Sequence, residues 1–545
     1  MTKYRGNPWA VLIVVSLGFF MTLLDLTIVN IAIPNMIDKL HANLDGVLWV
    51  INAYALVLAV LLITAGRLGD LRGQRNLFIG GVALFTIASV ACGFSPTVDW
   101  LITFRAVQGV GAALLMPQTL AMLTMVFPAE RRGAAFGVWG AVAGVATIAG
   151  PTLGGLLVTA FDWRYIFFIN LPIGIIVIIL GLVLIPDLRT GTQHKLDIPG
   201  VVIASLALLA ICYGLVEGQN YDWGTITGFI SIPLIIGVGV ALLVVFLFIQ
   251  ARTQDQEPLV PFALFRDRNF SLMNWVSATV SIGLLGIFLP LTIYLQSALG
   301  FSALKAGLAI APSSLMSMFV APVAGRLTDR IGGKYILVTG LLLFAGGMSW
   351  VAIIATPHST WEDFVAPLVV SGFGLGCTFA PLTTTAMRSV QPALAGAASG
   401  MLNTTRQVGS VIGTAAVGAL LENRLTVTLP AAVRAHDAAL PPTARSQLIT
   451  GFTQAARSGS AVGTGNNSIK LPPGTPPSIV AEVGRVAREA FSFGYVSAMH
   501  QTLIMPIAVL AVTALSCLAI KQVKKPPRPA DEKASPQPEA SQAAA

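Results

Sequence analysis

Long apolar runs, each close to the length that crosses a lipid bilayer, recur along the whole chain. A helix needs roughly 20 consecutive, mostly apolar residues to span the hydrocarbon core of a bilayer. Fourteen stretches meet this requirement, with approximate limits 9–33, 47–66, 77–95, 100–122, 134–158, 165–186, 198–217, 225–250, 270–297, 304–325, 335–355, 363–387, 398–421 and 500–520. The pattern predicts an all-α polytopic membrane protein with 14 transmembrane helices.

Two segments are too polar to cross a membrane. Residues 422–499 are rich in Ala, Pro, Gly and Thr, and we interpret them as one long extracytoplasmic loop. Within this segment, apolar residues recur at helical spacing at Ile479, Val483, Val486, Ala487 and Phe491. This spacing predicts a short amphipathic helix across the outer mouth. Residues 522–545, with their lysines, prolines and closing alanines, are predicted to form a disordered cytoplasmic tail.

Composition excludes an ordinary soluble domain. Hydrophobic residues make up 55% of the 545 residues and charged residues only 10%, whereas about a quarter of a typical soluble domain is charged. The net charge of +9 could suggest a nucleic-acid partner, but the cations gather in alternate loops. With the N-terminus inside, the short outer loops hold only Lys39, Arg164 and Lys305. This asymmetry follows the positive-inside rule. It predicts a protein of the cytoplasmic membrane with both termini cytoplasmic, the bilayer as surroundings and no nucleic-acid partner.

The sequence contains no pattern for a metal or a cofactor. The four cysteines lie far apart, each inside an apolar stretch, so they form neither a disulfide framework nor a metal cluster. No P-loop and no globular domain for an ATPase is present. Energy for transport would therefore come from an ion gradient. A polytopic membrane enzyme or sensor is the weaker alternative.

Three ionisable residues stand inside apolar stretches, and one of them, Arg406 in the thirteenth predicted spanner, is either structural or pore-lining. Asp25 lies in the first predicted spanner and Arg105 in the fourth. A charged side chain at that depth costs roughly 2.5–3.5 kcal/mol, so it normally faces the interior and has a function. Asp25 is our candidate for a proton or cation site, with Arg105 as its chemical partner. The alternative is that each residue serves only helix packing.

An internal repeat divides the chain. The loop from Gly66 to Arg75, with Asp70, follows the second spanner, and a copy from Gly325 to Lys334, with Asp329, follows the tenth. Repeated halves are how secondary transporters are built. We therefore expect a six-helix bundle in residues 1–186, two extra helices in 187–269 and a second six-helix bundle in 270–521 that includes the 422–499 loop.

The glycines of these motifs indicate close backbone contacts. Gly66, Gly69 and Gly73 permit a tight loop that approaches a neighbouring helix, and Asp70 is placed to meet either an opposing helix N-terminus or an arginine. The basic residues of the same loop are Arg72 and Arg75. In the fifth spanner, Gly150-Pro151 predicts a bend, and Gly144, Gly154 and Gly155 predict close packing between the two halves.

The motifs resemble those of the 14-spanner drug:proton antiporters of the major facilitator superfamily. The resemblance is carried by segments 24–34, 66–75, 101–111, 144–155 and 163–172, and more weakly by 325–334. It implies the major facilitator fold and proton-coupled export of amphipathic, cationic compounds by alternating access. It also implies that Asp25 and Arg105 couple transport to protons, that the Gly66–Arg75 loop with Asp329 latches one conformation, and that Gly150 to Gly155 favour export over uptake.

Polar and aromatic residues of the spanners are candidates for a substrate cavity. They are Asn30, Asn52, Tyr54, Gln108 and Arg406. Two other transport functions stay open: export of an endogenous lipid or siderophore, and uptake by a permease.

Overall fold

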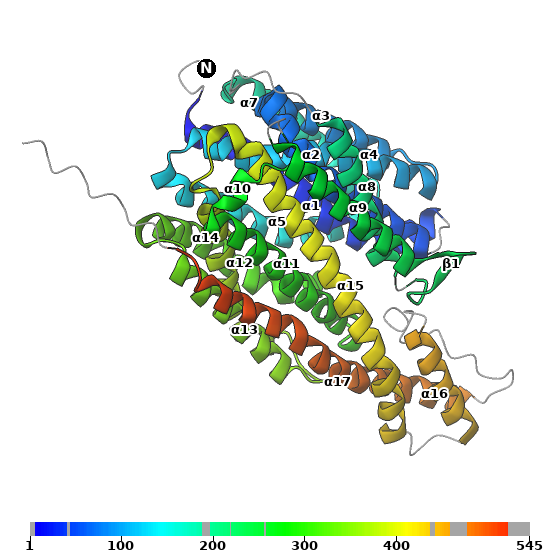
Figure 1. Cartoon of the computed structure of the whole chain (residues 1–545). Coiled ribbons are helices and arrows are strands. Elements are labelled where there is room, and N and C mark those ends of the chain that lie inside the picture. The colour runs from blue at the N-terminus through cyan, green and yellow to red at the C-terminus, as the bar shows by residue number, and fades with distance from the viewer. Residues whose placement is uncertain are drawn as a thin grey trace, which may run out of the picture.

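The computed structural model of the chain describes residues 6–40, 44–187, 197–218, 220–254, 258–436, 442–457 and 477–521. These residues fold into two helical bundles and a separate helical pair (Figure 1). The predicted tail 522–545 lies outside the described residues.

The first bundle is built by the N-terminal helices, drawn from blue through cyan to blue-green in Figure 1. Its long helices are α1 (Pro8–Leu40), α2 (Leu44–Arg72), α3 (Gln74–Gly93), α4 (Val98–Val126), α5 (Arg132–Ala160) and α7 (Asn170–Leu184). A 3-10 turn (Ala129–Arg131) precedes α5, and the short α6 (Tyr165–Phe168) precedes α7. Gly73 has φ +90°, a conformation that favours glycine, and it separates α2 from α3.

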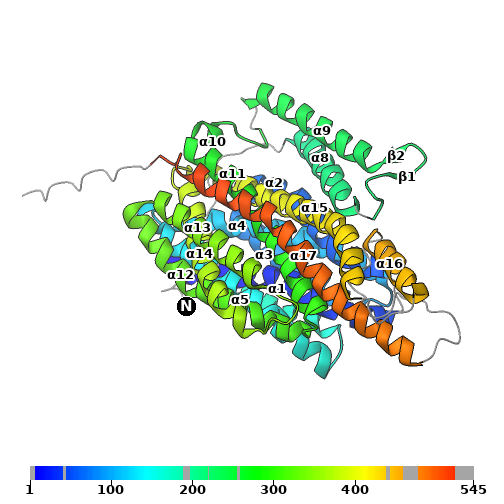
Figure 2. The ribbon, with the colours of Figure 1, turned by 90° about the horizontal axis from the view of Figure 1, so that it is seen from below.

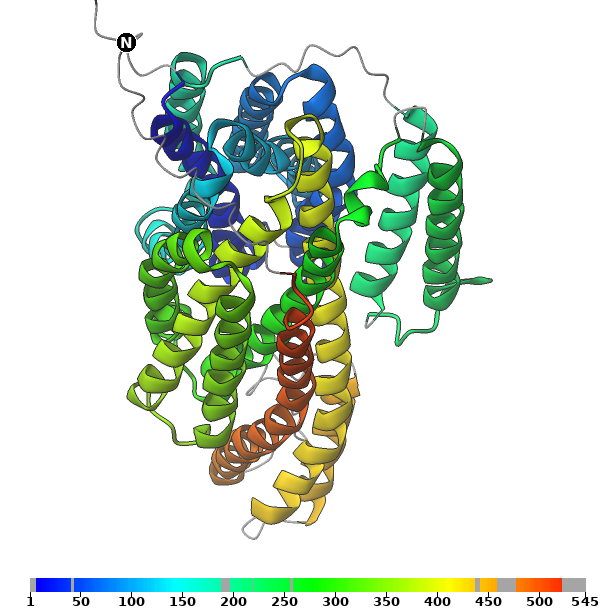
Figure 3. The same ribbon diagram turned by 60° about the vertical axis from the view of Figure 1, so that its left-hand side comes forward.

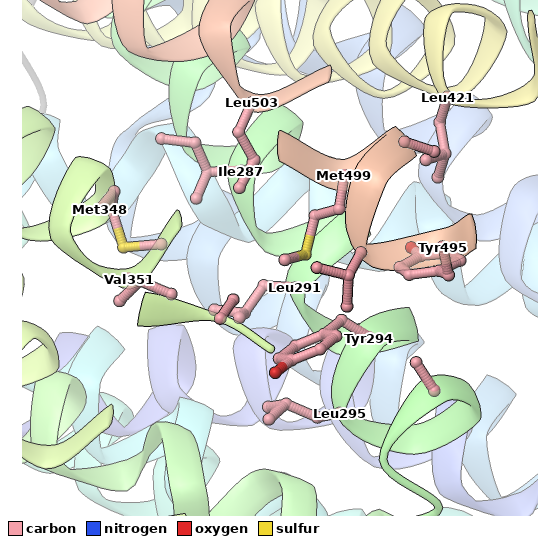
Figure 4. Close-up of a cluster of buried hydrophobic side chains, with 14 of the residues drawn as sticks. Ile287, Leu291, Tyr294, Leu295, Met348, Val351, Leu421, Tyr495, Met499 and Leu503 are labelled. Carbon is pink, nitrogen blue, oxygen red and sulfur yellow. The ribbon is translucent and has the colours of Figure 1, made fainter. Parts of the chain in front are cut away.

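The second bundle repeats this arrangement. Its long helices are α11 (Arg268–Ile293), α12 (Ala303–Ile331), α13 (Lys334–Ile354), α14 (Val365–Met387), α15 (Ala395–His436) and α17 (Pro477–Cys517). Shorter elements are α10 (Ala263–Arg266), a π turn (Tyr294–Ala298), 3-10 turns (Glu362–Phe364, Pro392–Leu394) and α16 (Pro442–Arg457). Part of its core is shown in Figure 4, where Leu291, Val351 and Met499 bring α11, α13 and α17 together.

The helical pair lies beside the two bundles (Figures 2 and 3). It consists of α8 (Ile198–Glu217) and α9 (Ile232–Arg252), joined by the hairpin β1 (Thr225–Thr227) and β2 (Ile230–Ser231). α8 packs on α2 and α15, while α9 exposes apolar side chains such as Val244. The predicted eighth spanner was therefore placed too early, because the hairpin occupies its first residues.

Glycines let the bundles approach each other at two helix crossings. A Cβ on Gly137 of α5 would lie 2.6 Å from the carbonyl oxygen of Ala321 of α12. The matching crossing brings Gly400 of α15 against α2, where a Cβ would lie 2.9 Å from the carbonyl oxygen of Leu62. The two crossings are related: α5 of the first bundle meets α12 of the second, and α15 of the second bundle meets α2 of the first.

The count of 14 spanning helices stays a prediction. Within the described residues, 12 helices are long and apolar enough to cross a membrane. The two predicted spanners outside this group correspond to α5 and α15. Both are long helices that lie at the crossings between the bundles.

The prediction of one long loop over residues 422–499 was wrong. α15 continues to His436, α16 follows, and α17 begins at Pro477, so most of the described part of this segment is helical. The extensions of α15 and α17 bury a shared apolar seam that includes Leu429, Val486 and Phe491. The helical spacing around Val486 was thus interpreted correctly, but it belongs to α17 and not to a separate short helix.

Candidate functional site

The two buried charges of the first bundle form an ion pair. Asp25 of α1 and Arg105 of α4 are both fully buried, and Arg105 Nη1 lies 2.5 Å from Asp25 Oδ2. Gln108 lies one turn beyond Arg105 on the same face of α4, and its Nε2 donates to Asp25 Oδ1 at 2.9 Å. The carboxylate therefore has charge-assisted hydrogen bonds on both oxygens.

Arg105 is held by several groups besides Asp25. Its Nε donates to the carbonyl oxygen of Val50 at 3.0 Å, and its Nη1 donates to Gln108 Oε1 at 2.8 Å. The ring of Tyr54, from α2, lies 4.3 Å from the guanidinium carbon, an arrangement that stabilises a desolvated cation. Tyr54 and Gln108 are fully buried parts of this network. That they line a substrate cavity stays a prediction.

The sequence did not predict that a third side chain, Asn170, donates a hydrogen bond to Asp25. Asn170, the first residue of α7, is fully buried, and its Nδ2 donates to Asp25 Oδ1 at 3.4 Å and to Ser89 Oγ at 3.0 Å. Cys92 of α3 donates to Gln108 Oε1 at 3.7 Å. Asn170 could have been noticed as a lone amide between the aromatic run 165–168 and the apolar run of α7.

Asp70 contacts the N-terminus of a helix in the other bundle. Its two carboxylate oxygens each accept a backbone N–H, from Gly396 and Ala397 of α15, at 2.8 Å. Gln74 donates to the same carboxylate at 3.1 Å. Such a contact satisfies free N–H groups and complements the positive end of the helix dipole.

Asp329 makes the corresponding contact in the opposite direction. Near the end of α12, it accepts the N–H groups of Gly133 and Ala134 of α5, at 2.8 and 3.0 Å. Gly66 supports the first contact, because a Cβ there would lie 2.5 Å from the carbonyl oxygen of Gly396. The two acids thus join the bundles through two related helix ends.

Arg132 adds a contact that has no counterpart in the repeat. It is buried at the start of α5, donating to the carbonyl oxygens of Thr124 and Phe127 at the end of α4. The same guanidinium donates to the carbonyl oxygen of Met387, the last residue of α14 in the other bundle, at 2.9 Å. The sequence indicated only a cation of a short loop at this position.

The predicted loop from Gly66 to Arg75 is the end of α2, Gly73 and the start of α3, and its other residues act within the first bundle. The side chain of Gln118 occupies the space next to Gly69 and donates to the carbonyl oxygen of Ala65 at 2.8 Å. Arg75 donates to the carbonyl oxygen of Leu182 in α7 at 2.7 Å, and Arg72 is exposed.

The glycines of α5 divide between two neighbours. Gly144 packs against α12, as predicted, since a Cβ there would lie 2.8 Å from the carbonyl oxygen of Ser314. Gly150 and Gly154 pack instead against α1 of the same bundle, next to Thr27 and Ile28. Gly155 has open space around it, so the predicted contact between the halves was wrong for Gly154 and Gly155. α5 continues as one helix through Pro151.

The remaining cavity candidates lie apart from the Asp25 network. Asn30 is exposed on α1 and donates to the carbonyl oxygen of Leu26, while Asn52 of α2 is half-buried. Arg406 of α15 is half-buried and donates to Asn403 Oδ1 at 2.8 Å. The structure does not bring these three residues together with Asp25 through any hydrogen bond between described residues.

Comparison with known proteins gives consistent matches. The family model "Major Facilitator Superfamily" matches residues 15–414. The multidrug resistance protein Stp of Mycobacterium tuberculosis is 35% identical over 419 residues, which cover 77% of this chain and 76% of that protein. The tetracenomycin C resistance and export protein of Streptomyces glaucescens is 35% identical over 429 residues, 78% of each chain.

A solved structure supports the fold. The human organic anion transporter MFSD10 (TETRAN) is similar with a TM-score of 0.55, covering 92% of this chain and 99% of that chain. The sequence identity of 12% limits this likeness to the fold alone.

Proposed function

The chain belongs to the major facilitator superfamily, and we propose that it exports amphipathic cations across the cytoplasmic membrane in exchange for protons. The resemblance to the major facilitator superfamily and the all-helical membrane fold predicted from the sequence are confirmed, while the count of 14 helices stays a prediction. The family makes this a multi-pass transporter of small molecules. The names of the relatives, multidrug resistance and tetracenomycin C resistance and export, support drug export.

The buried Asp25–Arg105 pair is the observation that carries proton coupling. A carboxylate without solvent contact, inside a transporter, is a candidate for binding either a proton or a cation. In the proposed cycle Asp25 takes up a proton from outside or a cationic substrate from inside, never both. Arg105 stabilises the charged carboxylate between these events, because it supplies the opposite charge at contact distance.

The contacts of Asp70 and Asp329 would close the cytoplasmic end of the transporter in one half of the cycle. Both acids bind helix N-termini of the opposite bundle, and the positive-inside pattern predicts that this end faces the cytoplasm. Opening toward the cytoplasm would require both contacts to separate. Drug binding from the cytoplasm would then compete with their re-formation.

Proteoliposomes test this function with a defined probe, the monovalent cation tetraphenylphosphonium. Exchange of one monovalent cation for one proton moves no net charge, so transport should respond to an imposed pH step and ignore an imposed membrane potential. One pH unit is worth about 1.4 kcal/mol and supports roughly tenfold accumulation. Asp25→Asn should abolish the pH-driven transport, and Asp25→Glu should retain part of it.

Full pH-driven transport by Asp25→Asn, inserted and folded like the wild type, would remove Asp25 from the coupling. A strong response to the potential would contradict one-for-one exchange and require a second coupled proton. Asp162→Asn is the matched control, since Asp162 is a partly exposed carboxylate paired with Arg164 in the loop before α6.

A further inference from the structure

The hydrogen bonds around Asp25 suit its charged form only. Arg105, Gln108 and Asn170 all donate to its carboxylate oxygens, at 2.5, 2.9 and 3.4 Å. Protonation would add an O–H group that needs an acceptor, because a buried donor without a partner is destabilising. A site that takes up and releases a proton must therefore offer an acceptor in the protonated state.

Gln108 is poorly suited to be that acceptor. Its Oε1 already accepts Arg105 Nη1 at 2.8 Å and the thiol of Cys92 at 3.7 Å. Turning the amide over would place two donors against the arginine. Gln108 is thus fixed with its NH₂ group toward Asp25 in both protonation states.

Asn170 has the acceptor that Gln108 lacks. Its Oδ1 is buried and has no hydrogen-bond partner among the residues that the structure describes. The terminal torsion of an asparagine is broad and roughly two-fold, so half a turn exchanges its NH₂ group and its oxygen. Ser89 can accommodate both orientations, because its hydroxyl now accepts Asn170 Nδ2 and donates to the carbonyl oxygen of Phe167 at 2.9 Å. After the turn, the hydroxyl could donate to Asn170 Oδ1 instead.

We propose that Asn170 is a positioning residue of the proton site that donates to Asp25 when the carboxylate is charged and, turned over, accepts its proton-bearing oxygen. This inference rests on the proposed function of Asp25. The other titratable groups facing Asp25 are Arg105 from α4, Tyr54 from α2 and Cys92 from α3. α7 contains no titratable residue, and α5 contains only Arg132, at its far end.

Two transport modes separate this role from a structural one. Export of tetraphenylphosphonium driven by a pH step requires Asp25 to bind a proton, whereas exchange of labelled for unlabelled tetraphenylphosphonium without a gradient does not. Asn170→Leu should therefore slow pH-driven export about tenfold, the effect of roughly 1.4 kcal/mol. Exchange should stay close to the wild-type rate. Asn170→Thr, whose hydroxyl donates and accepts, should recover part of the pH-driven export.

Asn423→Leu, at an exposed asparagine of α15, is the control and should change neither mode. Equal losses of both modes in Asn170→Leu would show a structural role and overturn the inference, as would unchanged pH-driven export. Asp25→Asn measured in parallel separates the two proposals. If it keeps pH-driven export, the proposed coupling through Asp25 fails; if only the Asn170 variants behave as wild type, the inference about Asn170 fails.

Infrared spectroscopy gives a second test on the wild-type protein, independent of how the variants fold. The difference spectrum between high and low pH should contain the carboxyl band of Asp25, identified by its loss in Asp25→Asn. A side-chain amide band of asparagine, identified by isotope labelling and by its loss in Asn170→Thr, should change over the same pH range. An unchanged asparagine signal would overturn the inference.

Discussion

Asp25 and Arg105 are each other's counter-charge in a region without solvent contact. A buried ion pair contributes little net stability, but removing one partner leaves an uncompensated charge and costs about 3–5 kcal/mol. Tyr54, Gln108 and Val50 orient the guanidinium but supply no negative charge. Substitutions of Asp25 and Arg105 should therefore affect the thermal stability of the protein and its pH-driven transport differently.

We expect Arg105→Gln to lower the thermal stability of the purified protein strongly, because it leaves the Asp25 carboxylate unpaired. The double variant Asp25→Asn/Arg105→Gln should recover most of the loss, since it contains neither charge, yet it should not recover pH-driven transport. Thermal unfolding in detergent measures the effect. Arg485→Gln, at an exposed ion pair of α17, should leave the unfolding temperature nearly unchanged. A double variant no more stable than Arg105→Gln would contradict the explanation.

At the scale of elements, the contacts between the bundles combine close backbone packing at glycines with hydrogen bonds from helix N-termini to carboxylates. Gly66 and Gly400 let α2 and α15 approach to backbone contact, and Asp70 then reaches the end of α15. The same geometry recurs where Gly325 of α12 meets Gly133 of α5 next to Asp329. Backbone atoms cannot move aside as a flexible side chain would. A substitution that disturbs the close backbone packing should therefore separate the bundles more than one that removes the charge of Asp70.

Gly66→Ala should shift the equilibrium away from the joined state by about 1–3 kcal/mol, because a Cβ would lie 2.5 Å from the carbonyl oxygen of Gly396. Asp70→Asn keeps the fit and loses the charge, with an expected cost of about 1–2 kcal/mol. Distances between spin labels at the exposed positions Asn76 and Gln391 measure the separation of the bundles. Gly80→Ala, where a Cβ meets nothing within 4 Å, is the matched control. Equal distances in Gly66→Ala and Gly80→Ala would refute the importance of the fit.

At the scale of the whole molecule, two additions distinguish this chain from a plain pair of six-helix bundles (Figures 1 and 3). One is the helical pair, and the other is the extension formed by the end of α15, by α16 and by the start of α17. The cation asymmetry predicts that the extension faces outward and that the joined helix ends face the cytoplasm. The four cysteines are all buried, so an engineered cysteine can report its side of the membrane with little background.

An impermeant thiol reagent applied to intact cells should label Thr450→Cys in α16 and leave Glu130→Cys unlabelled. Both positions are exposed, and they lie at the ends predicted to be outside and inside. Permeabilised cells should label both. Protection of Thr450→Cys in intact cells, with labelling after permeabilisation, would reverse the proposed topology.

The sequence by itself determined the class of protein, the repeat and the charged residues worth attention. These inferences depend on quantities that add along the chain: the length of an apolar run, the distribution of cations, and the spacing of Gly66, Asp70 and their copies. The end of each apolar run also marks where a helix leaves the hydrocarbon. It does not mark where the helix ends, which is why α15 and α17 continue through the predicted loop.

Only the tertiary structure decided which side chains meet. In a soluble helix the polar face reveals the direction of the core, but a membrane helix is apolar toward both lipid and protein, so periodicity carries little information about direction. The sequence therefore suggested Arg105 as the partner of Asp25 without showing contact, and did not reveal Asn170 or the distribution of Gly150 and Gly154 toward α1. Those contacts follow from how the helices rotate against each other when small residues let their backbones approach.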